Sequence, residues 1–127
     1  MKKINHKFYD KKYFESGIQS KKSCYINYSW MPDLTIPMAY KIIKYLKISE
    51  KQKVLDFGCS KGFLVKSFRK LGFNAYGADI SKYAISNCDL EVKKYCKLIT
   101  EKKYNPFNFK FDWIITKDVL EHLSENQ

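Results

Sequence analysis

The chain has 127 residues, which is enough for one domain with a single hydrophobic core. Hydrophobic residues make up 45% of the sequence and aromatic residues 17%, and this composition excludes a disordered polypeptide. The formal net charge is +11, but Arg69 is the only arginine among the 24 basic residues, so we interpret the charge as a lysine-rich solvated surface and do not expect a nucleic-acid binder.

The cysteines and the N-terminus bear on the compartment. Cys24, Cys59, Cys88 and Cys96 form no C-x-x-C pair, and the chain has two histidines, so we do not expect a zinc site. The polar, lysine-rich residues 1–12 do not have the pattern of a signal peptide, and no apolar run is long enough to span a membrane. We therefore expect a cytoplasmic protein with reduced thiols and no membrane span.

Residues 1–32 carry aromatic side chains between lysines without a clear period. We expect turns and short helices here, forming an N-terminal cover segment ahead of a domain at residues 33–127. Packing against the core is the simpler interpretation of these aromatic rings, and contact with a cationic ligand is the alternative.

The next predicted element is a helix at residues 35–47. Its apolar positions recur with helical spacing at Ala39, Ile42, Ile43 and Leu46. Asp33 or Thr35 can cap its N-terminus, and Pro37 is tolerated in a first turn. We expect this helix to pack beside the first strand of a sheet.

The central stretch is residues 53–62, KVLDFGCSKG. An apolar run ends in the carboxylate Asp56, and Gly58, Ser60 and Gly62 follow at alternate positions. A helical pattern of apolar residues begins directly afterwards. The sequence therefore predicts a buried strand, a tight glycine turn and a helix whose first N–H groups face a ligand.

The residues of this turn indicate which ligand it holds. A dinucleotide-binding turn requires a small residue where Phe63 stands, and Asp56 would repel phosphate groups, so a cationic ligand fits better. The pattern D-x-G-x-S-x-G resembles motif I of the class I S-adenosylmethionine-dependent methyltransferases, with Ser60 in place of the middle glycine. The resemblance implies that S-adenosyl-L-methionine is the cofactor and that it contacts Asp56, Gly58, Cys59, Ser60 and Gly62.

A second strand is predicted at residues 73–78, and Asp79 follows it. Asp79 lies 23 positions beyond Asp56, which is the spacing at which an acidic residue binds the hydroxyls of a ribose. The alternative is that Asp79 caps the next helix, in competition with Ser81. In the methyltransferases this acid belongs to motif II, and the resemblance places Ile80 against adenine.

The stretch after Asp79 gives weaker signals. Residues 81–95 are predicted to be mainly helical, with an interruption allowed at Asp89 and Leu90. Residues 96–100 are a candidate short strand, and residues 101–108, which include a proline, are predicted to be a loop.

Residues 111–116, FDWIIT, are predicted to form a strand covered on both faces. Together with the KDVLEHL that follows, they resemble methyltransferase motif IV, so the resemblance extends over about residues 34–127. It implies a Rossmann-like α/β fold that supplies strands 1–4 of the seven-stranded sheet, in the family order 3-2-1-4-5-7-6. It also places Thr116 and Lys117 at the cofactor.

The sequence stops at Gln127, before the later strands of that sheet. We therefore expect a truncated product or the N-terminal piece of a longer protein. The fourth strand would then be an exposed edge, where a second copy or another partner can pair.

Asp118, Glu121 and His122 would share one face of a helix. In ubiquinone-pathway O-methyltransferases and small-RNA 3′-end methyltransferases a similar acid-x-x-Glu-His cluster binds a divalent metal. A capping-box-like helix start with Asp118 at the N-cap is the interpretation we favour, so we assign no metal ligand. We predict His122 and Asp118 as the catalytic candidates beside the acceptor.

The sequence thus predicts a methyltransferase that acts on a small molecule of the sugar, lipid or quinone type. The alternative is a catalytically incomplete fragment that binds S-adenosylmethionine and acts with a partner. A nucleic-acid base methyltransferase is disfavoured, because an Asn-Pro-Pro-Tyr-type motif is expected after the fourth strand and Lys117 begins the sequence KDVL instead.

Overall fold

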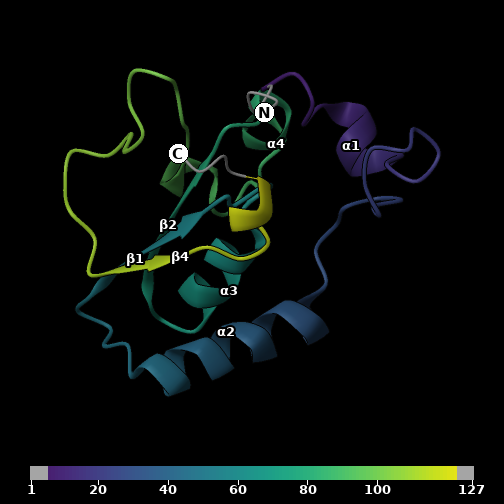
Figure 1. Cartoon of the computed structure of the whole chain (residues 1–127). Coiled ribbons are helices and arrows are strands. Elements are labelled where there is room, and N and C mark those ends of the chain that lie inside the picture. The colour runs from purple at the N-terminus through teal and green to yellow at the C-terminus, as the bar shows by residue number, and fades with distance from the viewer. Residues whose placement is uncertain (1–5, 123–127) are drawn as a thin grey trace.

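Four parallel strands form the centre of the computed structural model, which describes residues 6–122 (Figure 1). The strands are β1 (Lys53–Phe57), β2 (Asn74–Asp79), β3 (Cys96–Leu98) and β4 (Trp113–Ile115). Their order in the sheet is β3-β2-β1-β4, and each neighbouring pair is parallel. This order confirms the predicted Rossmann-like α/β fold and the predicted strands 1–4.

The register of the sheet brings the predicted site residues together. β1 pairs with β2 so that Asp56 lies opposite Gly77 and Phe57 lies opposite Ala78. On its other side β1 pairs with β4, where Asp56 lies opposite Ile115. Parallel strands end at the same edge of a sheet, so the residues that follow all four strands gather at one carboxyl edge.

Two helices cover one face of the sheet. α2 (Pro32–Leu46) and α3 (Phe63–Lys70) pack against each other on the same side of the strands (Figure 1). The core on this side contains buried side chains from both helices and from β1 and β2, namely Ala39, Ile43, Val54, Val65, Phe68 and Ala75. No helix within residues 6–122 combines the length and the apolar character needed to cross a bilayer.

The opposite face of the sheet is covered by the loop between β3 and β4, drawn in green in Figure 1. Phe107, Phe109 and Phe111 of this loop surround the ring of Tyr76, at centroid distances of 5.4, 4.9 and 5.7 Å. Leu55 and the other apolar residues on this face of the strands complete a second, smaller core. The apolar character of both faces of β1 is explained by these two cores.

The helix predicted at residues 35–47 begins earlier than expected, at Pro32. Proline is favoured at the first helical position because its φ is already helical and its missing N–H needs no partner there. Met31 occupies the N-cap without a side-chain bond, so the prediction of Asp33 or Thr35 as the cap was wrong. Pro37 lies within the helix and not in its first turn.

The helix predicted at residues 81–95 is much shorter than expected. α4 (Lys82–Ser86) is followed by a turn and by the 3-10 helix η1 (Lys93–Tyr95). Asp89 explains the interruption: its backbone N–H donates to the Lys61 carbonyl at 3.0 Å, and its carboxylate accepts from Lys66 Nζ at 2.8 Å. These tertiary bonds replace the helical hydrogen bonds that the local pattern predicted.

Strand ends also differ from the prediction. β3 is shorter than residues 96–100, and β2 is shifted by one residue from 73–78 to Asn74–Asp79. The strand predicted at 111–116 is confined to Trp113–Ile115. Asp112, just before it, bonds Lys53 through both its backbone and its side chain: the Asp112 N–H donates to the Lys53 carbonyl at 2.9 Å, and the Asp112 carboxylate accepts from the Lys53 N–H at 2.7 Å.

The described part of the N-terminal segment contains turns and the short helix α1 (Lys11–Glu15), as predicted. Phe14 is the buried residue of α1, and its ring stacks against Tyr83 of α4 at a centroid distance of 6.0 Å. Asp10 caps the helix by accepting from the Tyr13 N–H at 3.1 Å. The segment is thereby packed onto the carboxyl edge of the sheet.

Candidate functional site

A cleft of about 940 Å³ lies at the carboxyl edge of the sheet, between the strand ends and the N-terminal segment. A small-molecule site of this kind typically measures about 300–1,000 Å³. Nine of the predicted site residues line it: Asp56, Gly58, Cys59, Ser60, Asp79, Ile80, Lys117, Asp118 and His122. Gly62 and Thr116 do not line it.

Sequence reasoning missed one wall of the cleft. Ile99, Thr100, Glu101 and Tyr104 also line it. They follow β3 directly, and β3 lies next to β2 in the sheet. The signal that could have found them is their position after a strand of the same parallel sheet, because that position defines the carboxyl edge.

The glycine turn keeps its special backbone although Ser60 replaces the middle glycine. Gly58, Ser60 and Gly62 all have positive φ, at 89°, 51° and 80°. The N–H groups of Gly58 and Cys59 both donate to the Ala78 carbonyl, at 2.7 and 3.1 Å. The turn is therefore fixed to the end of β2, with its backbone at the floor of the cleft.

Gly62 contributes packing as well as backbone freedom. A Cβ at this position would lie 2.8 Å from Cys88 Sγ and 3.0 Å from Cys96 Sγ, two buried thiols beneath the turn. Gly72, which ends α3, has a similar φ of 88°, but a Cβ there would meet nothing within 4 Å. A comparison of substitutions at the two positions therefore separates the cost of backbone strain from the cost of overpacking.

We predict that Gly62→Ala lowers the free energy of unfolding by about 2–3 kcal/mol, because it combines a left-handed alanine with a clash against sulfur. Gly72→Ala is the matched control and should cost only the backbone strain, about 1–2 kcal/mol. Urea unfolding of both variants measures the difference. Equal losses in the two variants would contradict the packing role of Gly62.

Asp79 connects the glycine turn to α4. Its Oδ2 accepts from the Ser60 N–H at 2.8 Å, and its Oδ1 accepts from the Ser81 N–H at 2.7 Å. Burial raises the pKa of this carboxyl above its ordinary value, and the backbone N–H groups act in the opposite direction. Ser81 is the N-cap of α4, with its Oγ accepting from the Ala84 N–H, so the alternative of Asp79 as the cap was wrong.

Asp56 is a buried acidic residue of the cleft near the end of β1. Its side chain is 5% exposed, and no donor within residues 6–122 hydrogen-bonds its carboxylate. Burial first and the nearby Asp79 charge second raise the pKa of Asp56 to about 7, with Lys117 acting in the opposite direction. A buried carboxylate without a donor is costly, and a cationic group of a ligand would relieve that cost.

The residues after β4 do not form the predicted capped α-helix. Asp118 has a left-handed backbone with φ of 55°, and its carboxylate pairs with Lys117 instead of capping. A 3-10 helix, η2 (Leu120–His122), follows it, so the prediction of a capping box was wrong. Glu121 Oε1 lies 3.7 Å from His122 Nε2, and within residues 6–122 no three His, Cys, Asp or Glu side chains are grouped so that they could hold a metal ion.

Four tyrosines of the N-terminal segment form one wall of the cleft, which we call the tyrosine wall: Tyr9, Tyr13, Tyr25 and Tyr28. Neighbouring rings in it meet edge to face at centroid distances of 5.0, 5.8 and 4.8 Å. The Tyr9 ring also contacts the His122 ring at 6.0 Å, so the wall reaches the residues after β4.

Lys61 attaches the N-terminal segment to the glycine turn. Its Nζ donates to Glu15 Oε1 at 2.5 Å and to the Tyr28 carbonyl at 3.0 Å, and the residue is 9% exposed. The hydroxyl of Tyr83 donates to the same Glu15 oxygen at 2.9 Å. The Ser81 hydroxyl donates to the Tyr9 carbonyl at 2.6 Å and completes the attachment. The tyrosine wall is thereby fixed relative to the turn.

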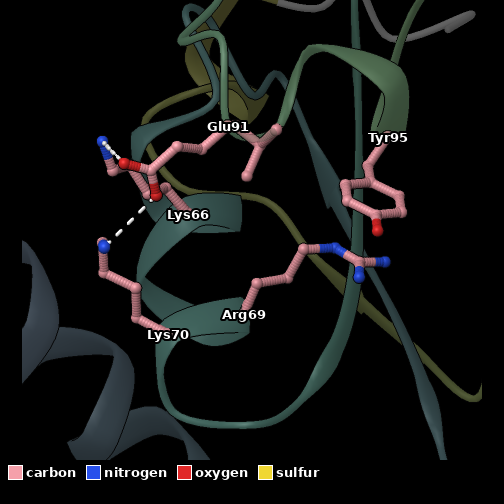
Figure 2. Close-up of a pocket in the computed structure, with 6 residues that line it drawn as sticks. Lys66, Arg69, Lys70, Glu91 and Tyr95 are labelled. Atoms are coloured by element: carbon pink, nitrogen blue, oxygen red, sulfur yellow. Dashed lines mark ion pairs between the residues drawn. The ribbon is translucent and has the colours of Figure 1, made fainter.

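A second, smaller pocket of about 240 Å³ lies between α3 and η1 (Figure 2). Its cations have partners: Lys66 and Lys70 each pair with Glu91 at 3.2 Å, and the Arg69 guanidinium lies 3.2 Å from the centre of the Tyr95 ring. The charges in Figure 2 are therefore largely satisfied within the pocket, which we interpret as structural.

Comparison with known proteins identifies one family and several solved structures with a similar fold. A family model described as a methyltransferase domain matches residues 35–126. Comparison with curated proteins found no match.

The solved structures that resemble the chain include two of one enzyme and one of another protein. The magnesium protoporphyrin IX methyltransferase of Synechocystis PCC 6803 with bound SAM has a TM-score of 0.58 and 16% identity over 98% of this chain and 66% of its own. The structure of the same enzyme with bound SAH has a TM-score of 0.51 and 22% identity, and the match covers 69% of this chain and 44% of the enzyme. A third structure comes from work on the conversion of a disulfide bond into a thioacetal group during echinomycin biosynthesis. It has a TM-score of 0.53 and 23% identity, and the match covers 65% of this chain and 36% of that protein. The chain thus spans between 36% and 66% of these structures.

Proposed function

The chain belongs to the methyltransferase-domain family, and on that basis we propose that its cleft binds S-adenosylmethionine and that the protein transfers the methyl group to a small-molecule acceptor. The observation that carries the proposal is the pair of buried carboxylates, Asp56 and Asp79, at adjacent strand ends in a cleft of about 940 Å³. The sugar, lipid or quinone character of the acceptor stays a prediction.

Each end of the cofactor has a matching group in this proposal. The Asp56 carboxylate has no hydrogen-bond donor in the described residues, and it would accept a hydrogen bond from the methionine ammonium. Asp79 uses one lone pair of each oxygen for a backbone N–H and has others left for the ribose hydroxyls. Ile80 lies beside it for adenine, and Thr116 and Lys117 stand at the end of β4.

The remaining contacts of the glycine turn would come from its backbone. Gly58, Cys59 and Ser60 line the cleft, and the absence of a Cβ at Gly58 lets the turn pass close to the Val119 side chain after β4. Gly62 does not line the cleft, so we assign it to the shape of the turn and not to direct contact. This modifies the role that the resemblance implied for it.

When bound, S-adenosylmethionine supplies a methyl group on a sulfonium whose positive charge disappears during transfer. The work of the protein is then to align the acceptor and exclude water. The tyrosine wall would serve both purposes, and its ring faces attract a positive charge. Asp118 and His122 line the cleft beyond the wall and are our candidates for taking a proton from the acceptor.

The alternative is a catalytically incomplete fragment that binds the cofactor and acts with a partner. The observation in its favour is β4, which is an edge strand of the described sheet with Ile114 63% exposed. Such an edge offers unpaired backbone groups to a second copy or another chain. Methyl transfer from labelled S-adenosylmethionine to a panel of small acceptors separates the two: binding without transfer favours the alternative.

We predict that S-adenosylhomocysteine binds the purified protein with one-to-one stoichiometry and that NAD does not bind. Isothermal titration calorimetry measures both. Glu91→Gln, in the second pocket, is the control and should leave the affinity unchanged because it lies outside the cleft. A folded protein that binds NAD in place of S-adenosylhomocysteine, or binds neither, would contradict the proposed function.

A further inference from the structure

The charge that lines the cleft is opposite to the charge of the whole chain. The chain has 24 basic and 13 acidic residues, whereas four carboxylates and a single lysine line the cleft within residues 6–122. The carboxylates belong to Asp56, Asp79, Glu101 and Asp118, and the lysine is Lys117. An even distribution of side chains would have placed more lysines than acids in the cleft, so the cleft is a distinct electrostatic environment.

Part of this acidic lining remains available to an acceptor when the cofactor is present. Lys117 pairs with Asp118, so those two charges cancel locally. Burial raises the pKa values of Asp56 and Asp79, and both carboxylates are assigned to the cofactor, so Glu101 is the lining carboxylate within residues 6–122 that has neither an ion pair nor an assigned cofactor contact.

The tyrosine wall adds ring faces to this acidic lining. Tyr9 and Tyr13 meet at an interplanar angle of 69°, and Tyr13 and Tyr25 at 68°, so the rings turn different edges and faces toward their neighbours. Burial raises the pKa of Tyr13 to about 12, so its phenol is neutral at neutral pH. A neutral phenol ring attracts a cation through its quadrupole and cannot pair with an anion through charge.

We propose that the acceptor carries a protonated amine, which the cleft binds between the tyrosine wall and the carboxylates of Glu101 and Asp118. This rests on the proposed function and names the acceptor class of that same site. The ammonium is a recognition group: its positive charge is favoured by the lining and its N–H groups have carboxylate acceptors within the cleft. A phosphate or carboxylate on the acceptor would face the same groups and be repelled.

The electrostatic environment of the cleft can be measured without knowing the acceptor. Three nitroxide probes of the same ring, 4-amino-TEMPO, 4-hydroxy-TEMPO and 4-carboxy-TEMPO, are a cation, a neutral molecule and an anion. Each increases the relaxation rate of nearby protons in proportion to its local concentration. The measurement is made on the whole protein, free and saturated with S-adenosylhomocysteine, on the ring protons of Tyr9, Tyr13 and Tyr25.

We expect the cationic probe to relax the tyrosine-wall protons at least threefold more than the anionic probe. Tyr45 on α2 is 86% exposed and lies outside the cleft, so it serves as the internal control, where the net charge of +11 should reverse the preference. Glu101→Gln should reduce the ratio at the wall. Glu50→Gln, in the connection before β1 at the opposite edge of the sheet, should leave it unchanged.

An equal response to the two charged probes at the tyrosine wall, or a stronger response to the anion, would overturn the proposal. The failure of the proposed function has a different signature, because calorimetry with S-adenosylhomocysteine reports it independently of the probes. A protein that binds S-adenosylhomocysteine and prefers the anionic probe would keep its function as a methyltransferase and lose the amine acceptor.

Discussion

Asp79→Ala is expected to weaken S-adenosylhomocysteine binding at least 100-fold and to lower the free energy of unfolding of the free protein by about 2–4 kcal/mol. The carboxylate accepts from the Ser60 and Ser81 N–H groups at 2.8 and 2.7 Å, and each hydrogen bond to a charged acceptor contributes about 1.5–3 kcal/mol. Its burial cost, which raises the pKa of Asp79, offsets part of this contribution. Urea unfolding and calorimetry measure the two effects.

Two further variants separate the ligand contact from the support of the turn. Asp79→Asn keeps the shape and acceptor oxygen but loses the charge, so it should retain more stability than Asp79→Ala while still binding weakly. Ser81→Ala removes the cap of α4 and the bond to the Tyr9 carbonyl but leaves Asp79 in place. If Ser81→Ala lost as much affinity as Asp79→Ala, the ribose assignment would be replaced by a purely structural role.

The strands and the glycine turn could be predicted from the sequence because their signals are local. β1 is apolar on both faces, since α2 and α3 cover one and the aromatic loop covers the other. The turn has a carboxylate at the end of the strand and three positions that require positive φ. Asp56 and Asp79 could be placed together because parallel strands end at one edge of a sheet.

The errors arise where distant contacts decide the local structure. The helix expected at 81–95 stops because Asp89 bonds to Lys61 and Lys66, neighbours that no helical period reveals. The ion pair of Lys61 with Glu15 joins residues 46 positions apart, so it could not be predicted from spacing.

The wrong cap at the end of β4 has a local cause. The pattern Asp118-x-x-Glu121 suits a helix start, but the neighbouring Lys117 takes the Asp118 carboxylate and the backbone there is left-handed. Glu101 was missed although a short strand was predicted directly before it, because the family resemblance assigns no cofactor contact after that strand.

Asp56→Asn is expected to make the free protein more stable at pH 8 while abolishing the favourable contact with the cofactor. Burial raises the pKa of Asp56 from 3.8 in the unfolded chain to about 7 in the fold. The unfolded carboxyl therefore loses its proton near pH 4, whereas the folded one keeps it until about pH 7. Stability must fall across that window as pH rises, because the unfolded state binds fewer protons there.

The full difference between these pKa values corresponds to about 4 kcal/mol. We expect Asp56→Asn to exceed the wild type by about 2–4 kcal/mol at pH 8 and by little at pH 4. Urea unfolding at pH 4, 6 and 8 measures this. Asp33→Asn, on the exposed start of α2, is the control and should change stability little at any of these pH values.

The same carboxyl should give the binding reaction its pH dependence. An ammonium stabilises the ionised form of Asp56, so S-adenosylhomocysteine should bind more tightly as pH rises through about 7 in the wild type and show no such rise in Asp56→Asn. A variant that is less stable than the wild type at pH 8, or that keeps the rise in affinity, would show that Asp56 has a partner in the fold. The predicted combination, greater stability with weaker binding, is what a carboxylate held in place for a cationic ligand requires, because its burial cost is recovered only when the ligand is bound.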